Sequence, residues 1–316
     1  MKHLYFCACT DNGGVYHYTL KGENLIFCEK TELNKPMYIA IEENKAYVIL
    51  KESDPKTKHG GVMTFDVDDN GKLVNPTDVV SSNGIVPCHL SVVNGTVYTV
   101  NYLSGNVVKI PDTVSTHSGK GPHPTRQTEA HTHFVSPTPD RKYLLCTDLG
   151  IDSIFTYTPE LKQVSIAKVP DGYGARHLAF SDDGKLVYCV NELVSSVSVF
   201  DYNDGVLTYL DTYECLPDFK EANTAAAIRV NGKYLYISNR GAETVTRLEI
   251  CGKELRLLEN TYCGGKNPRD FLIVDDLMLC TNEFTNDITV LKMIDGKPIL
   301  TETRLEMPNP LCVIAI

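Results

Sequence analysis

A small set of charged residues stands at the ends of short apolar runs, where a side chain is better placed for chemistry than for packing. Glu192 follows LVYCVN, Arg240 follows YLYISN, and Arg176 and Arg269 occur in the contexts GARH and NPRD. A carboxylate can move a proton. A guanidinium can bind a carboxylate or phosphate through two hydrogen bonds, or hold the charge that develops on a carbonyl oxygen. These residue types predict acid–base chemistry on an anionic or carbonyl-bearing substrate.

Histidines add to this set. His131 and His133, in AHTH, are two residues apart on an expected strand and should face the same way. We expect acid–base or substrate-binding roles for them, because two histidines without a spaced carboxylate motif are weak evidence for a metal site. His89 and His177 share with His133 the anchor position of the repeat described below, so we expect His89 and His177 to contact substrate rather than to be the catalytic group. No GxSxG, HExxH or P-loop pattern occurs in the sequence.

The segment from Gly174 to Phe200 shows how such residues can be brought together. It consists of three short apolar runs, separated by a Ser-Asp-Asp-Gly turn and by Asn191-Glu192, and therefore predicts an antiparallel meander. The first hairpin brings the start of one strand beside the end of the next. Arg176 and His177 should thus lie at the same open end as Glu192.

The same unit recurs along the chain and predicts the fold. Six steps cover the 274 residues from Tyr38 to Cys312, a period of about 46, which is typical of a four-stranded propeller blade. The last copy ends after one strand, and the N-terminal MKHLYFCACTDNGGVYHYTL supplies its second and third strands. We expect one all-β domain over residues 1–316, a seven-bladed propeller with four-stranded antiparallel blades and a ring closed by both termini. The repeats are anchored at Tyr38, His89, His133, His177, Ala227, Asp270 and Cys312.

Other folds fit less well. No 3.6-residue periodicity lasts for three turns, and no helical pattern separates the strands as a parallel βαβ fold requires. The Trp-Asp and Gly-His pairs of WD40 blades are absent, and the sequence has no tryptophan.

Comparing the copies separates recurrent residues from individual ones. An asparagine ends the second strand of several copies, which favours a structural role for its amide: Asn101, Asn191, Asn239 and Asn282. The next position varies and is polar: Lys51, Tyr102, Asp148, Glu192, Arg240 and Glu283. For Glu192 and Arg240 we favour function over a structural ion pair, we expect Asp148 and Glu283 to contact substrate, and we interpret Lys51 and Tyr102 as solvated residues.

Three insertions should crowd the same rim, because the connections after second and fourth strands emerge on the face where first strands begin. They are KESDPKTKHGG after Leu50, PDTVSTHSGKGPHPTRQTEA, and TYECLPDFKEAN. Connections longer than about 12 residues are usually functional. We expect them to wall a cup over the central channel.

Composition limits the partners and the compartment. A net charge of −10 argues against nucleic acid or an anionic membrane as a partner, since such binders need a basic face. Eleven cysteines without a CxxC pair favour a reducing cytoplasm. The apolar run in residues 1–10 is too short for a signal sequence, and no run approaches the length of a transmembrane helix.

Several segments together resemble the seven-bladed propeller lactonase family, which includes bacterial 6-phosphogluconolactonase and fungal carboxymuconate cyclase. They are VPCHLSV with VNY, GPHPTRQTEAHTHFV, TDLGIDSIFTY, the Gly174–Phe200 meander, ISNRGAETV, GGKNPRDF and TNEFTNDITVL. The resemblance covers nearly the whole expected ring. It implies that the channel residues of the family fall on His131 or His133, Arg176, Glu192 and Arg240, with Arg269 nearby. Pro36-Met37-Tyr38 and Leu50-Lys51 match the family poorly.

The resemblance implies hydrolysis of a small anionic lactone, most concretely 6-phospho-glucono-1,5-lactone, without a metal or other cofactor. Glu192 or a histidine of AHTH would take a proton from water, and Arg176 with Arg240 or Arg269 would stabilise the oxyanion. The remaining arginine, with Lys120, His123 or Arg126 from the second insertion, would hold the phosphate.

Three alternatives stay open at this stage. One is a carboxymuconate-type cycloisomerase that uses similar residues. Another is a non-catalytic propeller that binds a ligand or protein on its rim, since fold alone does not fix function. The third is a calcium-dependent lactonase, which would need oxygen ligands in the channel.

Overall fold

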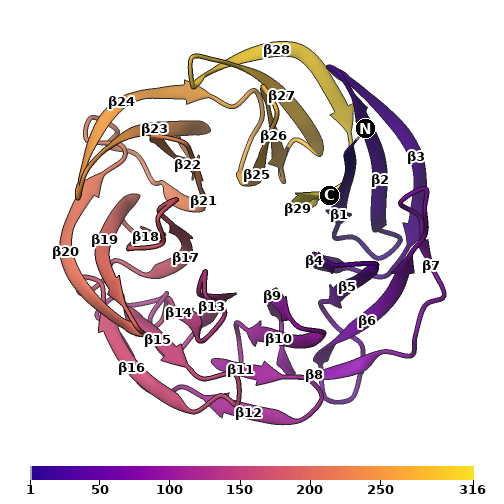
Figure 1. Ribbon diagram of the computed structural model, residues 1–316, viewed down its shortest axis with the longest axis horizontal. Helices are drawn as coiled ribbons and strands as arrows, with labels where there is room; N and C mark the ends of the chain where they lie inside the picture. The colour runs from indigo at the N-terminus through magenta and orange to yellow at the C-terminus, as the bar shows by residue number, and fades with distance from the viewer. Residues whose placement is uncertain (1) are drawn as a thin grey trace.

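The computed structural model describes residues 2–316, and over this range the chain forms 29 strands and no helix. The strands build seven antiparallel sheets arranged in a ring (Figure 1). Three sheets use the first part of the chain: β29 (Pro310–Ala315), β1 (Lys2–Ala8), β2 (Gly14–Lys21), β3 (Asn24–Glu32); β4 (Pro36–Glu42), β5 (Lys45–Leu50), β6 (His59–Val67), β7 (Leu73–Val74), β8 (Val80–Ile85); and β9 (Pro87–Val93), β10 (Thr96–Asn101), β11 (Asn106–Lys109), β12 (Thr113–Thr116).

The other four sheets follow in chain order, each with its first strand beside the central channel (Figure 1). They are β13 (Thr132–Pro137), β14 (Leu144–Asp148), β15 (Ser153–Tyr157), β16 (Gln163–Lys168); β17 (Ala175–Phe180), β18 (Leu186–Asn191), β19 (Ser196–Asn203), β20 (Val206–Glu214); β21 (Thr224–Asn231), β22 (Tyr234–Arg240), β23 (Thr244–Cys251), β24 (Glu254–Tyr262); and β25 (Pro268–Val274), β26 (Leu277–Asn282), β27 (Asp287–Ile294), β28 (Lys297–Glu306). The predicted seven-bladed propeller is confirmed.

Both termini complete one blade, as the sequence predicts. The innermost strand β29 pairs with β1 from Leu4 opposite Ala315 to Ala8 opposite Pro310. The N-terminal segment also supplies the outermost strand, β3, so the blade combines one C-terminal strand with three N-terminal ones. This arrangement leaves no unpaired inner edge at the junction of the ring.

The blade that begins at β4 departs from the regular pattern at its outer edge. Its fourth strand is split into β7 and β8, which pair with opposite ends of β6. The insertions are also shorter than expected. Thr113–Thr116 of the second belongs to β12, and the third begins only after Glu214, where β20 ends.

A β-bulge interrupts the inner strand of every blade at its channel-mouth end. In β17, Ala175 lies opposite Asn191 and His177 lies opposite Val190, so Arg176 is an extra residue. Such a bulge redirects a side chain and bends the strand. The seven extra residues form a ring of side chains at the channel: Met37, Cys88, His133, Arg176, Ala226, Arg269 and Leu311.

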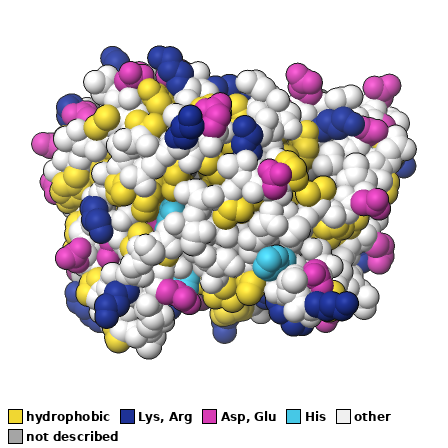
Figure 2. All heavy atoms as spheres, turned by 90° about the horizontal axis from the view of Figure 1, so that it is seen from below, with side chains coloured by type: hydrophobic (Ala, Val, Ile, Leu, Met, Phe, Trp, Pro, Cys, Tyr) yellow, Lys and Arg dark blue, Asp and Glu magenta, His cyan; other side chains and the backbone are white. Residues whose placement is uncertain are grey.

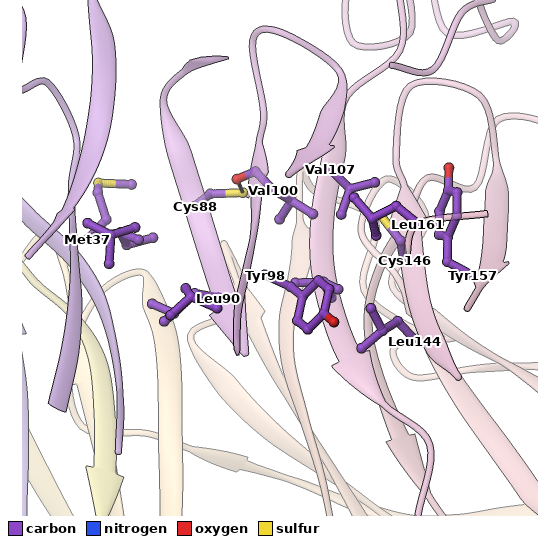
Figure 3. Close-up of a cluster of buried hydrophobic side chains, with 14 of the residues drawn as sticks. Met37, Cys88, Leu90, Tyr98, Val100, Val107, Leu144, Cys146, Tyr157 and Leu161 are labelled. Carbon is purple, nitrogen blue, oxygen red and sulfur yellow. Dashed lines mark hydrogen bonds between the residues drawn. The ribbon is translucent and has the colours of Figure 1, made fainter. Parts of the chain in front are cut away.

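The hydrophobic core lies between adjacent blades. In one cluster, Leu90, Tyr98 and Val100 of one blade pack near Leu144 and Cys146 of the next (Figure 3). The Tyr98 hydroxyl donates to the carbonyl of Pro159, so its burial leaves no polar group unpaired. Alternation along each strand therefore buries one face against each neighbouring blade.

The outer surface is mixed in character. On the side of the molecule seen in Figure 2, basic and acidic side chains are interspersed, with hydrophobic ones between them. The part of the chain that the structure describes contains no helix that could cross a membrane.

Candidate active site

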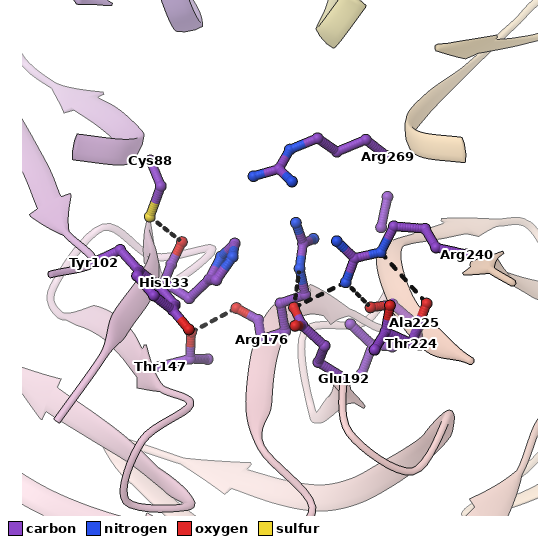
Figure 4. A network of polar contacts seen from close by, with 12 residues as sticks. Cys88, Tyr102, His133, Thr147, Arg176, Glu192, Thr224, Ala225, Arg240 and Arg269 are labelled. Carbon is purple, nitrogen blue, oxygen red and sulfur yellow. Dashed lines mark hydrogen bonds and ion pairs between the residues drawn. The ribbon is translucent and has the colours of Figure 1, made fainter. Parts of the chain in front are cut away.

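A cavity of about 220 Å³ opens at the mouth of the central channel, on the side where the bulges lie. Residues far apart in the sequence line it because the mouth ends of several blades meet there (Figure 4), and the second insertion adds Arg126. The polar side chains around it are Tyr102, Arg126, His133, Glu192, Arg240 and Arg269. We call this cavity the channel pocket.

Glu192 is the centre of the polar network. It follows β18 and is 3% exposed. Its Oε2 accepts from Arg176 Nε at 2.8 Å and lies 3.0 Å from Arg240 Nη2 (Figure 4). Its Oε1 lies 2.5 Å from Arg126 Nη2. Both carboxylate oxygens are therefore held by arginines from three separate parts of the chain.

These contacts determine the charge state of the network. Burial alone would raise the pKa of Glu192, but the charges of Arg240 and Arg176 lower it well below its usual value, so the carboxylate is ionised. Burial, and then the charge of Arg240, lowers the pKa of Arg176 from its ordinary value. Arg176 remains a cation at neutral pH, because an arginine starts from a pKa above 12.

The channel pocket carries more positive than negative charge. Arg269 reaches over the pocket opposite Arg176 and Arg240 (Figure 4), and its Nη1 lies 3.6 Å from Glu283 Oε2. Four arginines thus face two carboxylates within a protein whose net charge is −10. Such a local excess attracts an anion, and a doubly charged one would balance it.

Two buried anchors hold the insertion that carries Arg126. His117 Nδ1 lies 2.7 Å from Asp148 Oδ2, and its Nε2 lies 2.8 Å from the Tyr157 hydroxyl. Ten residues later, fully buried Gln127 donates to Asp152 Oδ1 at 2.7 Å and to the carbonyl of Leu149 at 2.8 Å. Arg126 is next to this second anchor.

Asp152 also supports the strand that carries Arg176. Its two oxygens accept from the backbone N–H of Gly174, at 2.7 Å, and of Gly172, at 2.8 Å. Gly174 has φ +73° and lies close to Leu193, which explains why a glycine is needed two residues before Arg176. One carboxylate therefore ties the Arg126 insertion to the approach of β17.

The two histidines of AHTH have different surroundings. His133 lines the channel pocket, and its Nδ1 is buried without a hydrogen-bond partner among the described residues. Burial, and then the charge of Arg176, lowers the pKa of His133 well below its ordinary value, so its imidazole is neutral at pH 7. His131 stacks on the Tyr102 ring at 4.4 Å, and its Nδ1 lies 3.0 Å from the Tyr102 carbonyl oxygen.

The expected alignment of this blade is wrong by one residue. Phe134 pairs with Thr147 as His177 pairs with Val190, so His133 matches the bulge residue Arg176 and not the anchor position. In the same way, Asp148 matches the buried Asn191, and Leu149 occupies the place of Glu192. Arg176 and Arg269 likewise lie within their strands, at the bulges, and do not precede them.

The shifted alignment explains the position of Asp148. It has no exposed surface, and besides His117 it accepts from the backbone N–H of His131 and Gly150. It is absent from the lining of the channel pocket. The recurrent asparagines are also fully buried, and their amides bond mainly to side chains of the third strand, as in Asn191 to Ser196 and Ser198.

His89 and His177 lie deeper in the channel, in a layer of aromatic side chains. The ring centroids are 5.6 Å apart, and Phe134 lies 4.2 Å from His89 and 4.9 Å from His177. Burial lowers the pKa of His89 to about 3 and that of His177 well below its ordinary value. Neither lines the channel pocket.

A larger cavity, of about 560 Å³, adjoins the channel pocket through Arg126 and Arg240. The second and third insertions both contribute to it, with His123 from one and Phe219 from the other. These two insertions therefore meet on one rim, as the sequence predicts. We call this cavity the rim pocket.

The arrangement supports acid–base and anion chemistry on a carbonyl group. It combines an unprotonated imidazole, an ionised carboxylate and guanidinium groups that can hold developing negative charge. Within residues 2–316, no group of three or more His, Cys, Asp or Glu side chains is placed to bind a metal ion.

Sequence reasoning did not identify the supporting residues. Gln127, Asp152 and His117 lie in irregular segments, where no periodic pattern indicates burial. Tyr102, predicted to be a solvated rim residue, lines the channel pocket and receives a hydrogen bond from Arg126 at 3.4 Å. Tyr102 occupies the repeat position that Glu192 occupies in another blade, and this correspondence is the sequence signal for its place in the pocket.

Comparison with known proteins adds independent information. The family described as "Lactonase, 7-bladed beta-propeller" matches residues 3–315. A 6-phosphogluconolactonase of Bacillus subtilis is 30% identical over 329 residues, which cover 95% of this chain and 93% of that protein. An uncharacterised protein of Staphylococcus epidermidis is 31% identical over 331 residues, which cover 95% of each chain. The crystal structure of a Lactobacillus plantarum protein superposes with a TM-score of 0.90 at 26% identity and covers 100% of both chains.

Proposed function

The chain belongs to the seven-bladed β-propeller lactonase family, and on this premise we propose that it hydrolyses 6-phospho-glucono-1,5-lactone to 6-phosphogluconate. That the chain is a lactonase follows from the family, whereas the substrate and the residue roles are our proposal. The eleven free cysteines fit our proposal that the reaction takes place in the reducing cytoplasm.

The observation that carries the proposal is the excess of arginine around a neutral histidine. Within residues 2–316, the ion pairs of these arginines, Arg126, Arg176, Arg240 and Arg269, are with Glu192 and Glu283, which leaves two positive charges for a substrate. A phosphate ester carries a charge of about −1.5 to −2 at neutral pH. We assign the phosphate to the Arg126 and His123 side, where the rim pocket adjoins the channel pocket.

The roles follow from the protonation states. His133 takes a proton from water as the water oxygen attacks the lactone carbonyl, because its imidazole is neutral and lines the pocket. Arg240 and Arg269, which line the pocket, stabilise the oxyanion of the tetrahedral intermediate. His133 then returns the proton to the ring oxygen as the ring C–O bond breaks. Glu192 holds three arginines in place, and with both oxygens paired it is a poor base.

The test is to measure turnover of freshly generated 6-phospho-glucono-1,5-lactone, with unphosphorylated glucono-1,5-lactone as comparison. We expect the phosphorylated lactone to have the higher kcat/KM. His133→Gln should lower kcat by about 100-fold or more. His131→Gln is the matched control from the same AHTH motif and should retain kcat within a few-fold. Equal losses of kcat in both variants would contradict the role of His133 as the base. Absence of turnover by the wild type would overturn the substrate assignment.

The arginine cluster also favours a second candidate, a carboxymuconate-type cycloisomerase. Guanidinium groups bind carboxylates as well as phosphates, so the same pocket could hold a substrate with several carboxylates. Assaying carboxymuconolactone formation beside the phosphogluconolactone assay separates the two. Activity in the first assay alone would replace the leading proposal.

A further inference from the structure

A second, much smaller cavity lies directly beneath the channel pocket. It measures about 10 Å³ and shares Met37, Cys88, His133 and Arg269 with the channel pocket above. Its own walls add Tyr38, Arg176, His177, Asp270 and Leu311, and the Asp270 carboxylate is paired with Arg229. A cavity of roughly this size holds one water molecule when polar groups surround it. We call it the floor cavity.

Three buried nitrogen atoms belong to residues that line the floor cavity, and none has a hydrogen-bond partner within residues 2–316. They are Arg176 Nη1, His133 Nδ1 and His177 Nδ1. The side chains that carry them are almost fully buried, at 2%, 5% and 4% exposure. Buried polar atoms are nearly always paired with protein atoms or with ordered water.

The chemistry of these atoms specifies the ligand. Arg176 Nη1 can only donate, so it needs an acceptor. A neutral imidazole has one unprotonated nitrogen, so His133 or His177 can accept a hydrogen bond at that nitrogen. One water molecule meets both needs, because its oxygen accepts from the guanidinium while its O–H groups donate to the imidazoles.

We propose that the floor cavity holds one ordered water between Arg176 Nη1 and His133 Nδ1, and that this water is the nucleophile of the hydrolysis. The second half of this inference rests on the proposed function, and the first half does not. The water oxygen forms the new bond to the lactone carbonyl carbon, and its proton passes to His133. The ring C–O bond then breaks, and the proton goes from His133 to the ring oxygen, which leaves as an alcohol.

Position supports a catalytic water over a purely structural one. The floor cavity meets the channel pocket at His133, Cys88 and Arg269, so a water there can reach a substrate carbonyl bound above it. The guanidinium of Arg176 polarises the water and favours loss of its proton. Each turnover consumes this water, and the cavity positions the next one beside the base before a substrate binds.

The first experiment is a crystal structure of the wild-type protein at a resolution that shows ordered water. We expect a density peak within hydrogen-bond distance of both Arg176 Nη1 and His133 Nδ1. If the two atoms instead contact protein groups, or no peak lies between them, the site does not exist. This result does not depend on the substrate, so it separates failure of the site from failure of the proposed function.

The second experiment tests the catalytic role by filling the floor cavity from Leu311, which lines it but does not line the channel pocket. Leu311→Phe should displace the water and lower kcat for 6-phospho-glucono-1,5-lactone by about tenfold or more, with KM changed less than about twofold. Leu311→Met, which conserves volume, is the matched control and should keep kcat within about twofold.

Folding of Leu311→Phe is checked by circular dichroism and thermal unfolding. His177→Phe is the second variant, since it replaces a polar wall of the floor cavity with an apolar ring without touching the channel pocket, and the same loss of kcat is expected. A folded Leu311→Phe or His177→Phe protein whose crystal structure lacks the water but whose kcat is unchanged would overturn the role of nucleophile.

Discussion

At the residue scale, the chemistry of the site depends on which groups are charged. Glu192 is buried as an ion because three guanidinium groups surround it. His133 is neutral because burial, and then the charge of Arg176, lowers the pKa of its imidazole. Positive charge around the pocket therefore keeps the carboxylate ionised and helps to keep the imidazole neutral. The carboxylate organises the arginines, and the imidazole stays unprotonated at pH 7.

Replacing Glu192 tests this division at the level of stability. Glu192→Gln keeps the shape of the side chain but leaves three buried or half-buried arginines without their counter-charge. Removing one partner of a buried ion pair costs about 3 to 5 kcal/mol, so we expect the free energy of unfolding, measured with urea, to fall by about that amount.

Glu283→Gln is the matched control for this prediction. Glu283 occupies the position of Glu192 in another blade but is 20% exposed and pairs with Arg269 at 3.6 Å. We expect it to cost less than about 1 kcal/mol, as partly exposed pairs do. Equal costs at both positions would show that the arginine cluster does not depend on Glu192.

At the element scale, a strand irregularity places the functional side chains. Each inner strand has one extra residue near the channel mouth, and three of these seven residues are Arg176, His133 and Arg269. The blades supply a repeated position, and the sequence varies the side chain there. The same bulge, filled by Met37 or Leu311 in other blades, forms the apolar part of the wall.

The ring and the closeness of Arg176 to Glu192 could be predicted from the sequence, whereas the bulges could not. A period of about 46 residues and alternating strands predicted the ring, and hairpin geometry placed Arg176 beside Glu192. The extra residue in each inner strand is not visible in an apolar pattern, so the sequence alignment puts His133 at the anchor position that Phe134 occupies in the structure. Asp148 was then placed on the rim, although it is the buried partner of His117.

The second insertion gives the prediction that belongs to this scale. Gln127→Leu removes the hydrogen bonds to Asp152 and to the Leu149 carbonyl that hold the chain next to Arg126. If Arg126 holds the substrate phosphate, KM for the phosphorylated lactone should rise by about tenfold, with kcat changed much less. Steady-state kinetics on both lactones measure this.

The control is Gln163→Leu, the same substitution on the exposed outer strand β16. It should leave both constants unchanged. KM for unphosphorylated glucono-1,5-lactone should also be insensitive to Gln127→Leu, because that substrate has no phosphate to bind. A similar rise in KM for both lactones would contradict the assignment of Arg126.

At the scale of the whole molecule, closing seven blades into a ring gathers imidazoles in a channel where they are almost fully buried. His89, His133 and His177 come from three consecutive blades and are 4–5% exposed. Their pKa values are lowered chiefly by burial. Each is neutral in the folded ring but becomes protonated in the unfolded chain below about pH 6.5. The ring therefore couples folding to proton binding.

This coupling predicts acid sensitivity with a definite sign. Below about pH 6.5 the unfolded chain binds protons on these histidines that the folded protein does not, so the free energy of unfolding falls as pH falls. Each histidine contributes a slope of up to about 1.4 kcal/mol per pH unit. For His89 the loss continues down to its folded pKa of about 3. Urea unfolding at a series of pH values between neutrality and the onset of acid denaturation measures the slope.

His89→Phe isolates one of the three contributions. Phe134 occupies the corresponding position in the next blade, so an aromatic hydrocarbon ring fits this layer of the channel. Below about pH 6, the free energy of unfolding of the variant should fall less steeply with falling pH than that of the wild type. The slopes should differ by the contribution of about one proton, because the variant has one histidine fewer to protonate on unfolding. Above about pH 7, where the unfolded chain also keeps its histidines neutral, the two proteins should show the same pH dependence. Parallel slopes in the acid range would mean that His89 is protonated within the folded ring.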